Sequence, residues 1–172
     1  QDFFIDTCTD FSLLNLMGYV LLAEKDYASC THIFEKYILL AQQNEDKEHE
    51  HIGLHQLAMI YRDQGDFHKA LKLIEDEEKI VEEHFPNDNL KKAVNNYEQG
   101  YLRLKLNNLD EALTFMNLSL EQSLETDDVI SQACSYRGLG EIYLALEDTE
   151  LSNRHFKRAI ELFESVGEFE GI

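Results

Sequence analysis

Four copies of one residue pattern follow each other along the sequence, at intervals of 40, 42 and 40 residues. Each copy has a small residue, a second small residue twelve positions later, and a bulky apolar residue four positions after that. A fixed period of this length is typical of a solenoid, in which similar helical units stack and bury a continuous core. The sequence therefore predicts a repeat protein, and its long surface favours binding over catalysis. The copies are Gly18, Cys30 and Phe34; Ala58, Ala70 and Ile74; Gly100, Ala112 and Met116; and Gly140, Ser152 and Phe156.

Apolar residues within each copy recur at the helical spacing of three and four, as Leu14, Met17 and Leu21 do in the first. Turn-forming pairs stand where each helix must reverse, and an Asp or Asn there can cap the next helix. These pairs are Lys25-Asp26, Gly65-Asp66, Asn107-Asn108 and Glu147-Asp148. Strand patterns are missing, so we predict an all-α fold of antiparallel helix pairs. The expected helices are 10–24, 27–43, 48–64, 67–85, 89–106, 109–124, 128–146 and 149–167.

The four copies resemble the tetratricopeptide repeat (TPR). The last copy matches that motif at Tyr136, Leu139, Gly140, Tyr143, Asp148, Phe156 and Ala159, and the stretches 60–71 and 106–113 match it too. The resemblance implies a right-handed α-α superhelix, a TPR solenoid of four antiparallel helix pairs at about 10–43, 48–85, 89–124 and 128–167. Its repeats are about six to eight residues longer than the usual length of about 34.

Lengthened repeats of this kind resemble those of peptide-sensing regulators in Gram-positive bacteria and of some eukaryotic cargo and spindle adaptors. The resemblance implies two alternative functions. The chain is either the ligand-sensing domain of a bacterial transcriptional regulator or a general protein–protein interaction scaffold with no sensing role. A helix-turn-helix upstream would favour the regulator, and further repeats on both sides would favour the scaffold.

The resemblance also implies a binding groove. In such repeats the first helix of each pair lines the concave surface, and two motif positions one helical turn apart point inward. Tyrosine and arginine at such positions suit an extended peptide or protein ligand. The family's Lys and Asn clamp for a C-terminal carboxylate is not matched, which disfavours chaperone tails as ligands. The predicted groove residues are Asn15, Tyr19, His55, Met59, Arg62, Tyr97, Tyr101, Arg137 and Glu141.

One group of polar residues falls where the repeat expects small or apolar ones. Asn96, Gln99 and Arg103 share the helical face that the motif buries, and Glu77 replaces a small residue on the preceding helix. Because buried polar groups need partners, we predict a structural buried pair of Glu77 and Arg103, completed by Asn96 and Gln99. In the alternative, helix 89–106 is rotated and these groups reach the groove.

The charge of the chain excludes some partners. It carries 34 acidic and 15 basic residues, a formal net charge of −19. Phosphate backbones repel such a surface, so no direct binding to nucleic acid is predicted. The acidic runs 45–50 and 75–83 form either a solvated face or a field that steers a basic partner. No membrane-length apolar run and no secretory signal are visible, which predicts a cytoplasmic protein.

Catalytic and metal-binding patterns are missing from the sequence. His51 and His55 are four positions apart and could share a metal, but the pattern places no third ligand. Cys8, Cys30 and Cys134 are scattered, which indicates neither a disulfide framework nor a zinc site, and Cys30 is expected to be a packing residue. We therefore predict no enzymatic activity, no cofactor and no metal.

Both ends of the sequence resemble the interior of an array. Residues 3–5 are similar to the tail of an earlier helix, while Ile160, Phe163 and Val166 would show an apolar surface to a following repeat. Natural arrays end in a polar capping element. We therefore expect residues 1–172 to be a single array within a longer protein, with self-association into a homo-oligomer through an exposed end as a side effect.

Overall fold

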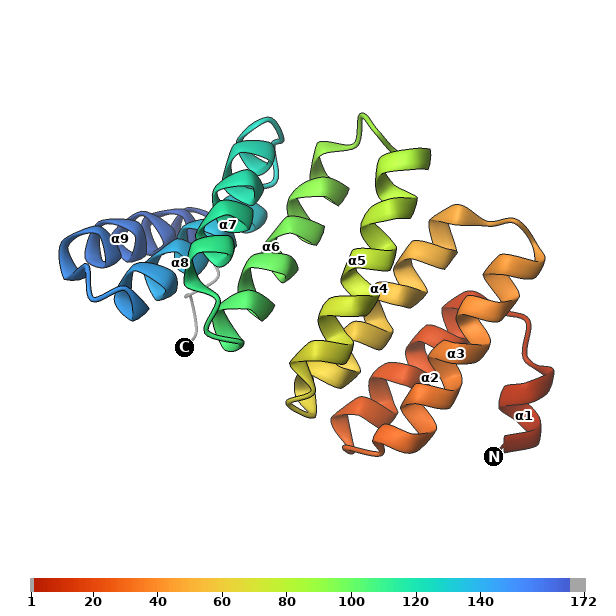
Figure 1. Cartoon of the computed structure of the whole chain (residues 1–172). Coiled ribbons are helices and arrows are strands. Elements are labelled where there is room, and N and C mark those ends of the chain that lie inside the picture. The colour runs from red at the N-terminus through yellow and green to blue at the C-terminus, as the bar shows by residue number, and fades with distance from the viewer. Residues whose placement is uncertain (1, 168–172) are drawn as a thin grey trace. The chain divides into compact units, whose positions relative to one another are not determined.

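The structure, a computed structural model, describes residues 2–167. Within these residues every regular element is an α-helix and no strand occurs, which confirms the predicted all-α class (Figure 1). The helices are α1 (Asp2–Thr7), α2 (Phe11–Ala23), α3 (Tyr27–Gln43), α4 (Lys47–Asp63), α5 (Phe67–His84), α6 (Asn89–Lys105), α7 (Leu109–Leu124), α8 (Val129–Ala145) and α9 (Thr149–Ser165).

The helix bounds agree with the sequence-based expectation. Each helix from α2 to α9 corresponds to a predicted helix, and their ends differ by at most about two residues. The expected tail of an earlier helix at residues 3–5 is also present as α1, which contacts α3. Helical periodicity therefore located every one of these elements.

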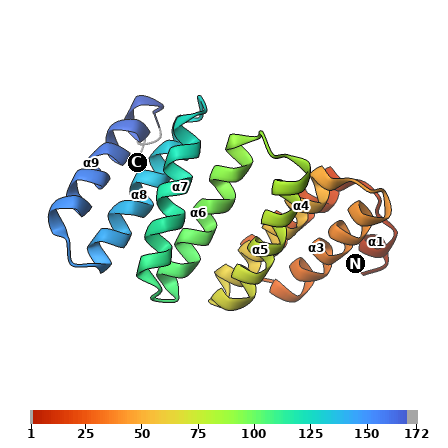
Figure 2. The same ribbon diagram turned by 45° about the horizontal axis from the view of Figure 1, so that its top comes forward.

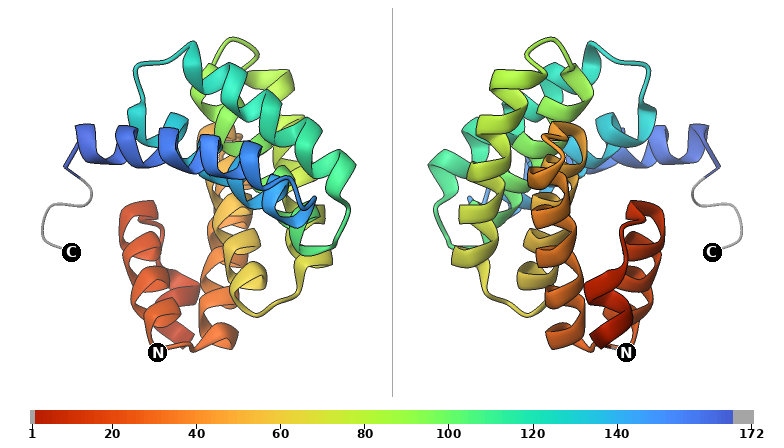
Figure 3. Two further views of the ribbon diagram at one scale, coloured as in Figure 1. Left: turned by 90° about the vertical axis from the view of Figure 1, so that its left-hand side faces the viewer. Right: turned by 90° about the vertical axis from the view of Figure 1, so that its right-hand side faces the viewer.

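The chain divides into two compact units, Gln1–Ile80 and Val81–Ile172, with the boundary inside α5. In the first unit α2 pairs with α3, and α3 contacts α4. In the second unit α6 pairs with α7 and α8 with α9, as antiparallel neighbours (Figure 2). The first helices of these pairs, α6 and α8, also contact each other, and α9 is the last helix of the unit (Figure 3, left panel). The predicted single array over residues 1–172 stays a prediction.

The turns after α2, α3, α4, α6 and α8 share one local design, which the turns after α5 and α7 lack. A residue with positive φ, such as Lys25 at 58° or Gly65 at 80°, ends one helix, and an Asp immediately after it caps the next. The Asp26 carboxylate accepts a hydrogen bond from the N–H of Ser29, and other Asp caps act in the same way. Asn108 is the exception among the predicted caps, since its side chain makes no capping hydrogen bond.

The repeated small residues allow close helix contact, as the pattern predicts. A Cβ atom added to Gly18 would lie 2.4 Å from the Phe34 ring, and one added to Gly140 would lie 2.7 Å from the Phe156 ring. The intervening small residue binds the same glycine: the Cys30 thiol donates to the Gly18 carbonyl at 3.3 Å, and the Ser152 hydroxyl donates to the Gly140 carbonyl at 2.8 Å. Cys30 is fully buried, so its expected role in packing is confirmed.

Candidate partner-binding surface

Helices α6 and α8 carry a direct contact between two of the predicted groove residues. Arg137 Nη2 donates a hydrogen bond to the Tyr97 hydroxyl at 3.2 Å, across 40 positions of sequence. The two residues occupy equivalent places in consecutive repeats, so the repeat period itself creates this cross-helix contact. The Tyr101 ring stacks on Tyr97 with a centroid separation of 6.3 Å. Tyr97, Tyr101 and Arg137 are therefore brought together.

The guanidinium of Arg137 is held in place although the residue is exposed. Its centre lies 5.8 Å from the centroid of the Phe163 ring on α9, within cation–π range. Partial burial of the guanidinium by itself would lower the pKa of Arg137. The hydrogen bond to Tyr97 and the charge interactions with Tyr97, Cys134 and Glu141 act in the opposite direction, and they raise this pKa above its ordinary value. Burial raises the pKa of Tyr97, and Arg137 opposes that rise. The pair therefore presents a fixed positive charge beside an aromatic ring.

A pocket of about 360 Å³ opens between the N-terminal halves of α6 and α8. Of the predicted groove residues it includes Tyr97 alone, so the sequence reasoning missed most of its wall. The repeat period is the signal that could have located this pocket. Leu90 and Ile130 are separated by the same interval as Tyr97 and Arg137, and so are Val94 and Cys134. The lining residues are Leu90, Val94, Tyr97, Glu98, Asp128, Ile130, Ser131 and Cys134.

Tyr101 is more deeply packed than the groove hypothesis assumes. A side chain that points away from the repeat core should leave folding unchanged when it is removed. Tyr101 instead is half-buried and packs against the core cluster that contains Met116 and Leu139. The Lys105 ammonium lies over the ring, 5.3 Å from its centroid. Tyr101 therefore also supports the fold, and its contribution to binding stays a prediction.

Of the remaining predicted groove residues, Glu141 is half-buried on α8, one turn beyond Arg137, and the others lie on α2 and α4 of the first unit. Tyr19 is 50% exposed, and its hydroxyl accepts a hydrogen bond from Gln56 Nε2 at 3.0 Å. Asn15 lies one turn earlier on α2, and its Oδ1 atom is buried without a hydrogen-bond partner among the described residues. Met59 and Arg62 are half-buried on α4. The membership of all these residues in one groove stays a prediction.

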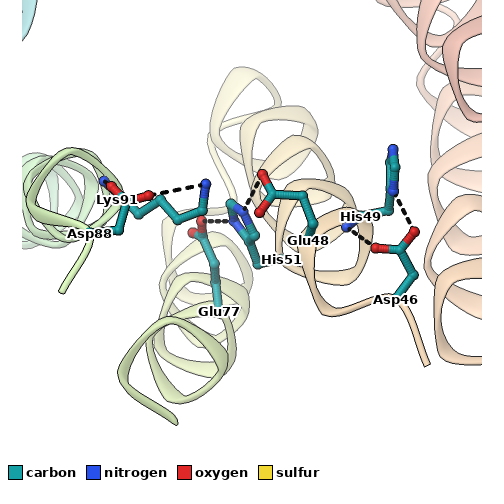
Figure 4. A network of polar contacts seen from close by, with 7 residues as sticks. All are labelled: Asp46, Glu48, His49, His51, Glu77, Asp88 and Lys91. Atoms are coloured by element: carbon teal, nitrogen blue, oxygen red, sulfur yellow. Dashed lines mark hydrogen bonds and ion pairs between the residues drawn. The ribbon is translucent and has the colours of Figure 1, made fainter. Parts of the chain in front are cut away.

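His55 has a different environment from the one expected. Its Nδ1 atom lies 3.1 Å from a carboxylate oxygen of Glu77 on α5, and Nδ1 of His51 lies 3.3 Å from the other. Glu77 is 3% exposed, and Glu48 lies 3.6 Å from the far side of the His51 ring (Figure 4). Burial alone would raise the pKa of Glu77, but the His51 and His55 contacts lower it. His55 therefore takes part in a buried polar cluster on the α5 side of α4.

The unexpected polar face of α6 is buried, as one of the two alternatives requires. Gln99 is 1% exposed and Arg103 is 8% exposed. Arg103 donates to Gln99 Oε1 at 3.1 Å and to Glu111 on α7 at 2.9 Å, and its guanidinium lies over the Phe115 ring. Asn96 is buried as well and donates to Gln122 on α7. Arg103 is thus turned toward α7. Its predicted pairing with Glu77 would join the two units, and that pairing stays a prediction.

Across residues 2–167 no three His, Cys, Asp or Glu side chains gather in a way that would hold a metal ion. None of the helices in this range combines the length and the apolar character that crossing a membrane requires.

Comparisons with known proteins agree with the helical-repeat fold. Two family models described as the tetratricopeptide repeat match the chain, one at residues 91–165 and the other at residues 53–76. The chain therefore contains tetratricopeptide repeats. A comparison with curated proteins finds no match.

Solved structures share the fold at low sequence identity. BtubC (BKLC) from P. vanneervenii is 15% identical with a TM-score of 0.78, over 91% of this chain and 64% of the BtubC chain. MamA from Desulfovibrio magneticus RS-1 is 18% identical with a TM-score of 0.63, over 91% of this chain and 77% of the MamA chain. This chain thus spans less than two thirds of BtubC. At these identities the likeness establishes the TPR fold and no shared activity.

Proposed function

We propose that this chain is a protein-interaction module and that α6 and α8 bind an extended segment of a partner protein. The observation that carries the proposal is the Tyr97–Arg137 hydrogen bond beside the apolar pocket of the same two helices. Tyrosine and arginine anchors dominate many protein interfaces. A fixed guanidinium loses less side-chain entropy on binding than a free one, so this arrangement is organised before the partner arrives.

The proposed surface extends to the first unit through its own inner helices. The half-exposed Tyr19 ring and the buried Oδ1 atom of Asn15 would contact the same segment, together with Met59 and Arg62. Glu141, one turn beyond Arg137, would select a basic side chain at its end of the segment. No catalytic or cofactor role is proposed for any of these residues.

The test is a selection of peptides from a displayed random library against residues 1–172, followed by fluorescence anisotropy with the selected peptides. Arg137→Ala should weaken binding by about tenfold, since truncation of an arginine anchor commonly costs more than 1 kcal/mol. Arg154→Ala is the matched control, because Arg154 is an exposed arginine on α9 of the same repeat. Equal affinities of the two variants, or a library with no binders, would reject the proposal.

We further propose that the module senses its ligand for a bacterial transcriptional regulator. Support comes only from the lengthened period of about 40 residues, which resembles such regulators. The alternative is a scaffold that joins proteins without sensing. The native polypeptide that contains residues 1–172 should bind DNA, and the selected peptides should change its DNA affinity. A longer polypeptide with additional repeats and no DNA affinity would favour the scaffold.

We also propose self-association through an end, because Ile160 on α9 and Val166 just after it are 48% and 43% exposed. Phe163, which was expected to be exposed with them, is instead buried in the core. Sedimentation of residues 1–172 should show a dimer that Ile160→Glu dissociates. A wild-type chain that stays monomeric over the whole concentration range would reject this.

A further inference from the structure

We infer that the pocket between α6 and α8 receives an aliphatic side chain of a partner protein, and that a lysine or arginine of the same segment lies beside it. This inference rests on the proposed function and names the class of segment that the surface would take. It concerns the part of the surface formed by the N-terminal halves of α6 and α8, where Tyr97 is the one predicted groove residue in the pocket wall.

The wall of the pocket calls for an aliphatic occupant. Leu90, Val94 and Ile130 line it and keep exposures of 37%, 36% and 38%, and the Tyr97 ring closes one end. Apolar side chains that stay exposed around one hollow gain when a second apolar group displaces their water. The volume of about 360 Å³ lies at the lower end of the range for ligand pockets. It suits an anchor side chain more than a complete cofactor.

The charge around the pocket calls for a basic neighbour. The charged residues in its wall, Glu98 and Asp128, are both acidic. Arg137 is hydrogen-bonded to Tyr97, so a cation of the partner is favoured beside Asp128 and disfavoured near Arg137. The net charge of −19 adds a long-range attraction for a basic segment.

The same charge argues against a second copy of this chain in the pocket. A second copy would bring a net charge of −19 to a pocket wall that is already acidic. The occupant is therefore a basic, aliphatic segment of a different protein.

To test the inference, the peptides selected from the library are sequenced. Their binding is then measured to variants that each lack one side chain of the pocket wall. The selected peptides should be enriched in Leu, Ile, Val or Met next to Lys or Arg. Val94→Ser and Ile130→Ser should each weaken binding by about tenfold. Leu118→Ser is the matched control, since Leu118 on α7 is 38% exposed, as is Ile130. Circular dichroism should show that all three variants remain folded.

Ionic strength tests the electrostatic part. Raising the salt from about 0.05 to 0.5 M should weaken binding of the selected peptides several-fold, because screening shortens the reach of surface charges. Replacing the peptide's basic residue with norleucine should remove most of this salt dependence.

The outcomes separate the two proposals. Peptides that lose affinity with Arg137→Ala but not with Val94→Ser or Ile130→Ser would overturn the pocket inference and leave the proposed function standing. Enrichment of acidic peptides, or a loss of affinity with Leu118→Ser instead, would also overturn the inference. A library without any binder would overturn both.

Discussion

Arg137 donates a hydrogen bond to Tyr97 at 3.2 Å, and the two residues are equivalent members of consecutive repeats. The contact exists because α6 and α8 pack side by side. Arg137 opposes the rise in the pKa of Tyr97 that burial causes. We therefore expect Arg137→Ala to raise the pKa of Tyr97 further. Absorbance titration of the phenol in the two proteins, with Tyr97→Phe to assign the signal, should detect the change, and an unchanged Tyr97 titration would contradict the contact.

The close approach at Gly140 predicts a large effect of any added side chain. An added Cβ would lie 2.7 Å from the Phe156 ring, so Gly140→Leu forces two packed helices apart. We expect a loss of about 1–3 kcal/mol or more in the free energy of unfolding, measured by urea denaturation. Combining Gly140→Leu with Phe156→Ala should recover part of that loss. An unchanged midpoint for Gly140→Leu would show that the helices do not meet there.

Glu77 predicts a pH-dependent contribution to stability. Its folded-state pKa is lowered because the contacts with His51 and His55 outweigh the cost of burial. A carboxyl with a lowered folded pKa stabilises the protein above its unfolded pKa of about 4.3 and loses that contribution as the pH falls through the folded pKa. Glu77→Gln should cost about 1–3 kcal/mol at about pH 7, and the difference from wild type should shrink below about pH 4.

Urea denaturation at a series of pH values measures this difference. Glu35→Gln is the control, because Glu35 is an exposed glutamate on α3 of the same unit. Other carboxylates, Asp46 among them, also have a lowered pKa, so acid will destabilise every variant. The comparison with Glu77→Gln isolates Glu77. A gap that stays constant down to about pH 3 would contradict the assignment.

The proposed pairing of Glu77 with Arg103 can be tested by a double-mutant cycle. If the pair exists, Arg103→Leu should cost about 3–5 kcal/mol by leaving a buried carboxylate, and the addition of Glu77→Leu should restore much of that loss. The coupling free energy from urea denaturation should then be about 0.5–3 kcal/mol. Additive effects would mean that Arg103 interacts with Gln99 and Glu111 but not with Glu77, and that Glu77 interacts with the two histidines but not with Arg103.

The helices and their turns were predictable because their causes are local. Apolar spacing of three and four located α2 to α9, and the Asp caps follow from side chains that reach an N–H three residues on. The contact of Gly140 with Phe156 was also readable, because a small residue and a bulky one recur at a fixed distance in every copy. Such features depend on residues that are close in sequence or repeated with the period.

The pocket and the polar partners were decided only by the tertiary structure. Sequence reasoning assigned His55 to a groove, but the packing of α4 on α5 brings it to Glu77. It assigned Tyr101 to the same groove, and the packing of the helices also brings this residue against the core cluster of Met116 and Leu139. The rotation of a helix about its own axis chooses which neighbour a side chain meets, and that rotation depends on the packing of all side chains at the interface. The sequence alone determined where each helix begins and ends, whereas the tertiary packing determined which of its faces remain open to a partner.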